Sequence, residues 1–507
     1  MRTSFIKRML VLILVLVFNY FFWSERLGIN LLIFCVFLFA SLVLFNRKSF
    51  SSLHVIILTC STLVLGGLVV YNNTLLSKCM FFIFFVTALG YIHLPQLRSI
   101  SFAFPTAVLN FFMFPYTWGK EMKEIFKGSK KISGAFRWVK LIVVPLLIII
   151  IFYAIYINAN PIFAEASDYV WAKFDDVFWQ IFRDFPLVRL LFIFLGLVIV
   201  TGFLYNSNID FLALKESQFK NELTRHYNPF GLYRSRFKAL GLINEKRSAI
   251  ILLVLVNLLI AILNYIDIRY VWFGFEYYKG FDIRQFVHEG TYLLILSILL
   301  SMGIMLFYFR RNLNFYTGNV WMKRLSYMWI LQNGIMAVSV GVRNYYYIYY
   351  SHILAYKRIG LIMFLIMVFA GLVTLYLKIN RKWTIYRLIK VNLVSVYTVL
   401  FISSFFNWGP IIAEYNLANP DKDAIEYEFI VELSNETLPI LDRHKDLLDR
   451  ELIFYDGLRR MKINGLTYYY EKKNQFIVDY EGDSWLSWNY TDWKTYEYFK
   501  DRKFLID

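Results

Sequence analysis

The stretch LGINLLIFCVFLFASLVLFNRK, residues 27–48, decides the fold class of this chain. The nineteen residues Leu27–Phe45 are nearly all apolar, and Arg47 and Lys48 follow them directly. An α-helix rises 1.5 Å per residue, so about 20 apolar residues cross a hydrocarbon core roughly 30 Å thick. Basic residues next to such a helix favour the cytoplasmic side. This stretch therefore predicts a transmembrane helix that ends on the cytoplasmic side.

Segments of the same kind recur along the chain and account for its composition. Hydrophobic residues make up 58% of the sequence and charged residues 18%, whereas soluble domains carry roughly a quarter charged residues. This excludes a soluble enzyme, a disordered chain and a fibrous repeat. We predict an all-α polytopic membrane protein with about 11 transmembrane helices. The predicted spans are Met9–Trp23, Leu27–Phe45, His54–Tyr71, Leu75–Leu94, Lys140–Ile157, Leu187–Tyr205, Ser248–Ile266, Val287–Phe309, Leu325–Val342, Ile359–Leu377 and Leu388–Phe406.

The distribution of basic residues predicts the orientation. With the N-terminus in the cytoplasm, the inner side receives 30 Lys and Arg residues and the outer side before the tail receives 11. Cytoplasmic loops carry such an excess of basic residues. An odd number of spans then places the C-terminus outside, and we predict a multi-pass protein of the cell inner membrane. The sequence pI of about 9.5 comes from these clusters beside apolar segments, so we do not predict nucleic-acid binding.

The predicted organisation has four parts. A membrane bundle covers residues 1–157, an outer amphipathic loop 158–186, a second membrane bundle 187–409, and an acidic domain 410–507. The second bundle includes a basic cytoplasmic loop at 206–247.

The apolar segment SFAFPTAVLNFFMFPYTW, residues 101–118, contains Pro105 and Pro115. A twelfth span here would place the basic loop at 206–247 outside the cell. We therefore predict that the segment is re-entrant or interfacial.

The acidic tail, residues 410–507, contains 13 Lys and Arg against 20 Asp and Glu. It is long enough for a small α+β extracytoplasmic domain. The spacing of its apolar residues and its turn residues predict three helices and a β-hairpin. Trp485, Trp488 and Trp493 fit the core of such a domain, with a glycan-binding platform as the alternative. The predicted elements are helices over Asp421–Leu433, Glu436–Met461 and Trp485–Lys503, and a β-hairpin of Leu466–Tyr470 with Gln475–Tyr480.

Five stretches resemble an uncharacterised family of bacterial polytopic membrane proteins, a domain-of-unknown-function group common in Bacteroidota. The resemblance runs from about Pro186 onward, and the first 186 residues match only as apolar spans. It implies a membrane location and a bacterial source, without an established reaction. The stretches are RSRFKALGLINEKRSAI (Arg234–Ile250), FVHEGTYLL (Phe286–Leu294), YFRRNLNFY (Tyr308–Tyr316), VGVRNYYYI (Val340–Ile348) and SWNYTDW (Ser487–Trp493).

Polar residues in and beside the spans are the candidate ligand site, because ionisable groups in a membrane segment are costly unless paired or hydrated. One interpretation is an outward-facing polar vestibule, with Glu289 paired to Arg343, that admits a polar or charged ligand. The other is a set of interhelical hydrogen bonds and ion pairs that hold helices together. Both interpretations stay open. The candidate residues are Asp267, His288, Glu289, Arg343, Asn264 and Gln332.

We predict that two other groups of residues lie at the membrane–water interfaces. Tyrosines between Tyr345 and Tyr350, with Trp272, fit an aromatic belt rather than a sugar-stacking groove. The basic segment Asn228–Arg247 fits a helix along the inner leaflet or a docking site for a protein. Its candidate surface or partner residues are Arg234, Arg236, Lys238, Lys246 and Arg247.

The function is the least determined part of the prediction. The chain lacks GxxxxGK[ST], HExxH, GxSxG and CxxC motifs, so the commonest nucleotide, zinc and serine-nucleophile chemistries have no motif here. We predict no cofactor, no metal and no catalytic residue. We predict a non-enzymatic scaffold or sensor that binds a partner or ligand on its outer face, at the tail or through the basic inner loops. Two alternatives are a transporter or channel for a polar solute or lipid, and a lipid-linked glycosyltransferase that would use Asp175, Asp176 or Glu289.

Overall fold

The computed structural model describes residues 2–113, 152–182, 187–207, 210–225, 235–276, 283–309, 312–316, 318–419, 425–456 and 459–500, with a few isolated positions besides. Within these ranges, the side chains of 2–4, 172–182, 187, 235–242, 283–293, 312, 455–456 and 459–460 are not described. The chain forms two compact units, which we describe separately. The first contains residues 1–216 and 449–507, and the second contains residues 217–448.

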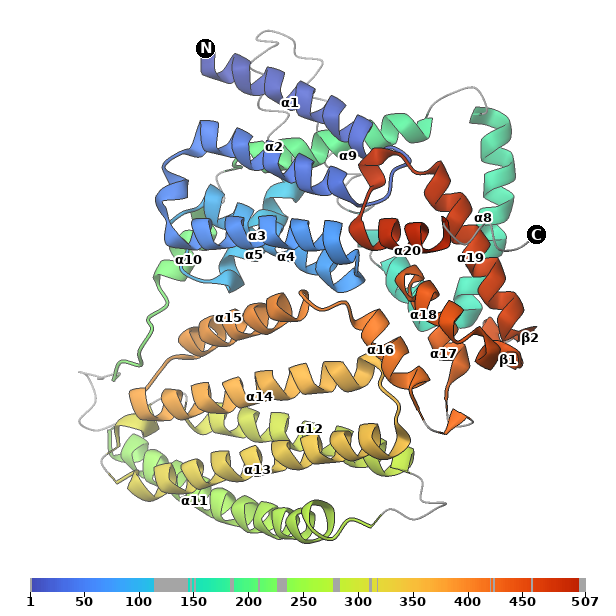
Figure 1. The fold of residues 1–507 in the computed structure, drawn as a ribbon. Coiled ribbons are helices and arrows are strands. Elements are labelled where there is room, and N and C mark those ends of the chain that lie inside the picture. Colours follow the sequence, from blue (N-terminus) through green and yellow to red (C-terminus); the bar gives the residue numbers. More distant parts are fainter. Residues whose placement is uncertain are drawn as a thin grey trace. The chain divides into compact units, whose positions relative to one another are not determined.

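The first four helices of the first unit confirm four predicted spans (Figure 1). They are α1 (Arg2–Phe22), α2 (Ile29–Asn46), α3 (Leu53–Asn72) and α4 (Leu75–His93). Consecutive helices pack against each other, so the α1–α2 and α3–α4 connections lie at the same end of the bundle. Apolar side chains such as Leu16, Leu44 and Ile57 are exposed on the outside. A soluble protein would bury them, whereas lipid solvates them.

Three more described helices belong to this unit: α5 (Ile100–Phe112), α8 (Pro161–Phe182), which lies within the predicted outer loop, and α9 (Leu187–Leu204). At 13 residues, α5 is about 20 Å long and too short to cross the hydrocarbon core. Its Asn110 donates to the carbonyls of Gly202 and Tyr205 at 2.5 and 2.8 Å. These bonds satisfy the C-terminal end of α9, so α5 holds that helix in place.

In the second unit, the membrane helices lie side by side around α13 (Figure 1). The unit contains α11 (Ser235–Ile266), the short π-helix η2 (Asp267–Trp272), α12 (Ile283–Tyr308), α13 (Val320–Ser351), α14 (Tyr356–Arg381) and α15 (Ile385–Ser403). Helix α13 packs against α11, α12 and α14. Buried apolar residues form the core between them, with Trp329 and Met336 of α13 at its centre.

Eight of the described helices are long and apolar enough to span a membrane. They match the first four and the seventh, ninth, tenth and eleventh predicted spans. The described parts of α9 and α12 form shorter apolar helices, at Val188–Leu204 and Leu294–Tyr308, where the sixth and eighth spans are predicted. Most of the predicted span Lys140–Ile157 lies outside the described residues. The total of eleven stays a prediction.

The predicted acidic domain is divided between the two units at residue 448. Its first part contains the short helices α16 (Trp408–Leu417), α17 (Tyr427–Val431) and α18 (Leu438–Arg443), with the 3-10 turns η5 (Asn435–Thr437) and η6 (Lys445–Leu448). The Asn416 side chain exchanges two hydrogen bonds with the backbone of Leu354, at 2.6 and 2.9 Å. This part of the tail is therefore attached to the α13–α14 connection.

The second part of the tail corrects two predicted elements. Residues predicted as the end of a helix form an antiparallel hairpin of β1 (Glu451–Asp456) and β2 (Arg459–Asn464). Residues predicted as a hairpin form the helix α19 (Gly465–Gly482). The reason is the role of Asn464, whose side chain accepts hydrogen bonds from the amides of Leu466 and Thr467 and caps the helix. The register pairs Asp456 with Arg459, so the chain reverses between these two residues instead. The chain then continues through η7 (Trp485–Ser487) into α20 (Tyr490–Lys500).

Candidate functional site

A ladder of polar side chains joins α11 to α13 in the second unit. The side-chain amide of Asn257 donates to the carbonyl of Leu325 at 3.1 Å. Seven residues later, Asn264 donates to the carbonyl of Gln332 at 3.0 Å. The Gln332 amide in turn donates to Asn257 Oδ1 at 3.2 Å. Seven residues are two helical turns, so the repeated spacing fixes the register of two parallel helices, as single polar residues do in coiled coils.

An ion pair ends this ladder. Arg343 Nη2 lies 2.6 Å from Asp267 Oδ1, and the two side chains are 11% and 2% exposed. Asp267 begins the π-helix η2, and such local changes of helical geometry are frequent at functional sites. The second carboxylate oxygen of Asp267 is buried without a hydrogen-bond donor among the described residues, as is Asn264 Oδ1. This combination is costly in a membrane segment.

The structure brings together four of the six predicted vestibule residues. Asp267 pairs with Arg343, and Asn264 bonds to the backbone of Gln332. The side chains of His288 and Glu289, on α12, lie outside the described residues, and so does the predicted pair of Glu289 with Arg343. Asp175 and Asp176 lie on α8, and their side chains are outside the described residues as well.

Aromatic residues cover the ion-pair end of the ladder. The indole of Trp272 donates to Ser339 Oγ at 3.0 Å, and the Tyr346 hydroxyl donates to the carbonyl of Trp272 at 3.3 Å. Phe275 stacks on Tyr346 with ring centroids 4.6 Å apart. Tyr345 and Tyr349 stack on each other and are exposed. Exposed tyrosines at a helix end are typical of the interface belt.

The predicted surface residues of the basic segment lie in or next to α11. Arg234 is outside the described residues, and so are the side chains of Arg236 and Lys238. Lys246 lies over the ring of Tyr316 at 5.2 Å, and Arg247 is exposed. Residues 235–266 form one continuous helix, so most of the predicted inner-leaflet helix is an extension of the span.

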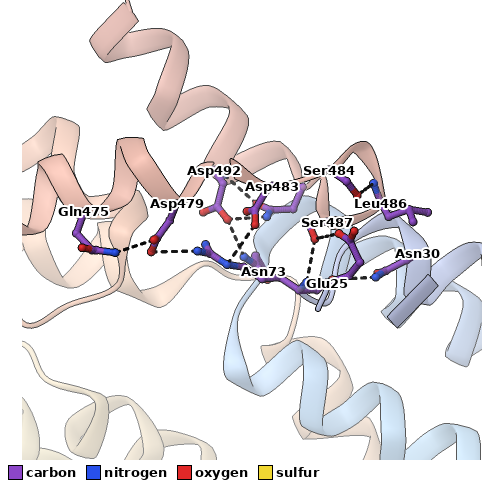
Figure 2. A network of polar contacts seen from close by, with 12 residues as sticks. Glu25, Asn30, Asn73, Gln475, Asp479, Asp483, Ser484, Leu486, Ser487 and Asp492 are labelled. Atoms are coloured by element: carbon purple, nitrogen blue, oxygen red, sulfur yellow. Dashed lines mark hydrogen bonds and ion pairs between the residues drawn. The ribbon is translucent and has the colours of Figure 1, made fainter. Parts of the chain in front are cut away.

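The second polar cluster, in the first unit, joins the C-terminal segment to the α1–α2 connection (Figure 2). The Arg26 guanidinium lies 3.0 Å from Asp479 and 3.6 Å from Asp483. The Ser487 hydroxyl donates to Glu25 at 2.6 Å and accepts from the Arg26 amide at 2.8 Å. One short connection thus contacts both the end of α19 and η7.

Backbone contacts make this docking close. The amide of Ile29 donates to the carbonyl of Trp488 at 3.0 Å. A Cβ atom on Gly28 would lie 2.5 Å from the Ser487 carbonyl oxygen and 2.6 Å from that of Trp488. Only glycine permits this approach. The fully buried Asn30 shapes the connection, because its side chain accepts from the Gly28 amide and donates to the carbonyls of Phe21 and Arg26.

The α3–α4 connection provides a second contact with the C-terminal segment. The side-chain amide of Asn73 donates to Asp492 Oδ2 at 3.2 Å, and that of Asn489 donates to the same oxygen at 2.6 Å (Figure 2). The ring of Tyr71 stacks on that of Tyr490, with centroids 4.9 Å apart. The segment therefore contacts both connections at this end of the bundle.

The carboxyl of Asp483 is a titratable group whose surroundings include this docking contact. Its pKa is raised above the ordinary value, first because burial disfavours the charged form. Arg26 opposes this effect, and the neighbouring carboxylates of Asp492, Glu25 and Asp479 add to it. Docking therefore shifts the protonation equilibrium of Asp483 toward its neutral form.

The tryptophans of the tail correct another prediction. Trp485 is 60% exposed and Trp493 is 39% exposed, so these two do not form a core, whereas Trp488 is half-buried. The core of this segment is made by Tyr469, Phe476 and Phe499 instead. The exposed tryptophans lie on a segment rich in charged residues, which makes them candidates for contact with a partner or with lipid.

Sequence reasoning missed the docking cluster, although it had singled out the segment Ser487–Trp493. Gly28 and Asn30, in the first apolar stretch, are the sequence signals for a close approach at that connection. The described residues contain no group of three or more His, Cys, Asp or Glu side chains that could hold a metal ion. The predicted absence of a cofactor stays a prediction.

A comparison with protein families finds a match over most of the chain. The model described as Domain of unknown function (DUF4153) matches residues 35–444. This match begins far before Pro186, where the resemblance was expected to start, and it does not include the tail stretch Ser487–Trp493. No curated protein and no solved structure matches the chain.

Proposed function

Since the chain belongs to the DUF4153 family, an uncharacterised family with apolar helices, we propose that it is a bacterial inner-membrane scaffold or sensor. In this proposal the N-terminus is cytoplasmic, the C-terminus is outside, and a partner or ligand binds at the outer face without a chemical reaction. The excess of basic residues on the predicted inner side supports the orientation. The contacts of the tail are consistent with it, because both of its parts are attached to connections predicted to be outside.

The observation that carries the proposal is the docked C-terminal segment. The face of this segment that contacts the helix connections is held by Glu25, Arg26 and Asn73. Its other residues include Trp485 and Val478, which are 60% and 67% exposed. A segment that is held firmly and still exposes large apolar side chains is suited to binding a partner, because the entropic cost of ordering the surface is already met.

The test compares native mass spectra of protein extracted gently from its own membrane. We expect a bound protein or ligand in stoichiometric amount, and we expect Trp485→Ala to reduce its occupancy at least tenfold. Trp321→Ala is the matched control, because Trp321 is 66% exposed at the predicted inner end of α13. Equal occupancy in wild type and both variants would contradict the proposal for the C-terminal segment.

The ion pair of Asp267 and Arg343 supports a second candidate, a transporter or channel with a polar vestibule. The buried oxygens of Asp267 and Asn264, which have no donor among the described side chains, favour it over a purely structural pair. Arg343→Gln and Glu289→Gln should each impair function while leaving membrane insertion intact. If both variants behave like the wild type, these residues are structural.

A further inference from the structure

The end of α14 and the turn that follows it contain two buried hydrogen-bond donors that the described residues do not fully satisfy. Lys378 is 1% exposed, and its ammonium group donates to the carbonyl of Trp383 at 3.0 Å. An ammonium has three N–H donors, and this bond uses one of them. The indole N–H of Trp383 is also buried, with no acceptor among the described residues. Both donors belong to the same turn of chain.

The surroundings of this turn are positively charged. Helix α15 begins here with Thr384 as its cap, which accepts from the Arg387 amide, and the N-terminus of a helix favours anions. Arg381, Lys382 and Lys390 lie within the same thirteen residues as Lys378 and Arg387.

The acidic group found at this turn is already paired. Glu222 is 3.3 Å from Arg387 and largely exposed. Its segment is fixed to the turn by backbone bonds from Leu223 to Lys382 and from Thr384 to Asn221. Arg387 also lies over the Trp383 ring at 4.3 Å. In the part of the chain that the structure describes, the cationic groups of this turn therefore exceed the carboxylates paired with them.

We propose that Lys378, the Trp383 indole and the N-terminus of α15 bind the phosphate of an anionic phospholipid headgroup. The phosphate oxygens accept several hydrogen bonds at once and provide the negative charge that a buried ammonium requires. The site lies where two membrane-spanning helices end, which is the depth of the headgroups. A free phosphate has the same chemistry, and the experiment distinguishes the two sources.

The competing explanation is that Lys378 only stabilises the C-terminus of α14. A cation in the last turn interacts favourably with the helix dipole and the final carbonyls. That role would not depend on lipid. A lipid-dependent measurement therefore separates the two explanations.

The experiment measures thermal unfolding of the full-length protein in micelles, titrated with phosphatidylglycerol, phosphatidylcholine or inorganic phosphate. We expect saturable stabilisation by phosphatidylglycerol alone. Lys378→Met should weaken its apparent affinity by about tenfold or more, and Trp383→Phe by about fivefold, as expected for a charged and a neutral hydrogen bond. Lys357→Met is the control, because Lys357 is exposed at the opposite end of α14 and should leave the affinity unchanged.

Three results would overturn the proposal. A loss of stability in Lys378→Met that is the same with and without phosphatidylglycerol would show a capping role only. Saturable binding of inorganic phosphate without binding of the lipid would assign the site to a soluble anion. If Lys378→Met does not fold, Trp383→Phe, which keeps an aromatic ring and removes only one side-chain donor, decides the question by the lipid adduct in native mass spectra. An unchanged adduct would refute the site.

Discussion

Gly28→Ala tests whether the C-terminal segment is held by a close backbone contact. The new Cβ atom would lie 2.5 Å from the Ser487 carbonyl oxygen, so the segment must move by about 0.9 Å to reach an ordinary contact. The bond from the Ile29 amide to Trp488, 3.0 Å long, would then exceed hydrogen-bonding distance. The bond from the Arg26 amide to Ser487, 2.8 Å long, would be lost with it.

The expected cost follows from these two bonds. Each contributes about 1 kcal/mol, and residual strain brings the total to about 2–3 kcal/mol. At 1.4 kcal/mol per factor of ten, the undocked fraction rises by about 30- to 150-fold. Amide hydrogen exchange of the protein in lipid nanodiscs measures this directly, as faster exchange in peptides that cover residues 485–495. Amide exchange within α3 and α4, which reports local unfolding of these helices, should not change.

Gly67→Ala is the matched control for this substitution. Gly67 lies in α3, and a Cβ atom there would meet nothing within 4 Å. Alanine favours a helix over glycine by roughly 0.5–1 kcal/mol, so this variant should exchange no faster than the wild type. Equal exchange of residues 485–495 in the two variants would refute the docking contact that we describe.

Three further predictions concern other polar contacts. Because docking raises the pKa of Asp483, the docked form gains stability as the pH falls through that pKa. Asp483→Asn should therefore slow amide exchange of the segment at neutral pH. It should also remove the gain in docking stability that acid causes in the wild type. Faster exchange in this variant would contradict the prediction. Asp267→Asn and Arg343→Gln should each lower the unfolding free energy by about 3–5 kcal/mol, because each removes one member of a buried ion pair. Chemical unfolding in micelles should show that the double variant loses less than the sum, and additive losses would show that the pair is not coupled. Asn110→Leu should cost about 3 kcal/mol in the same assay, because three hydrogen bonds at the end of α9 are lost. Asn158→Leu, at an exposed side chain, should cost less than 1 kcal/mol, and equal losses would contradict the role of Asn110.

Long-range contacts explain why the candidate sites were only partly predictable. The helical spacing of Asn257, Asn264 and Asp267 correctly indicated one polar face on α11. It did not indicate which acidic group lies 2.6 Å from Arg343, where the structure places Asp267. That choice depends on how two parallel helices are aligned in depth, and the sequence of one helix carries no such information.

The hairpin of the tail shows a similar limit for local signals. Asn464-Gly465 and Asp456-Gly457 are both turn signals, and only the second lies between two paired strands. The first became a helix cap, because the apolar residues Tyr469 and Phe476 of α19 are buried on one face. Tertiary burial decided which of two equivalent local signals formed the turn.

The sequence by itself determined the membrane helices, because a bilayer imposes its requirement locally. Every backbone group must be hydrogen-bonded within its own segment, so about twenty apolar residues specify a helix whatever lies elsewhere. Only the tertiary structure decided where the C-terminal segment docks. Ser487 and Glu25 are 462 residues apart, and their contact depends on the shape of a short connection and on one missing Cβ atom. Such complementarity exists between surfaces, and no pattern within either segment encodes it.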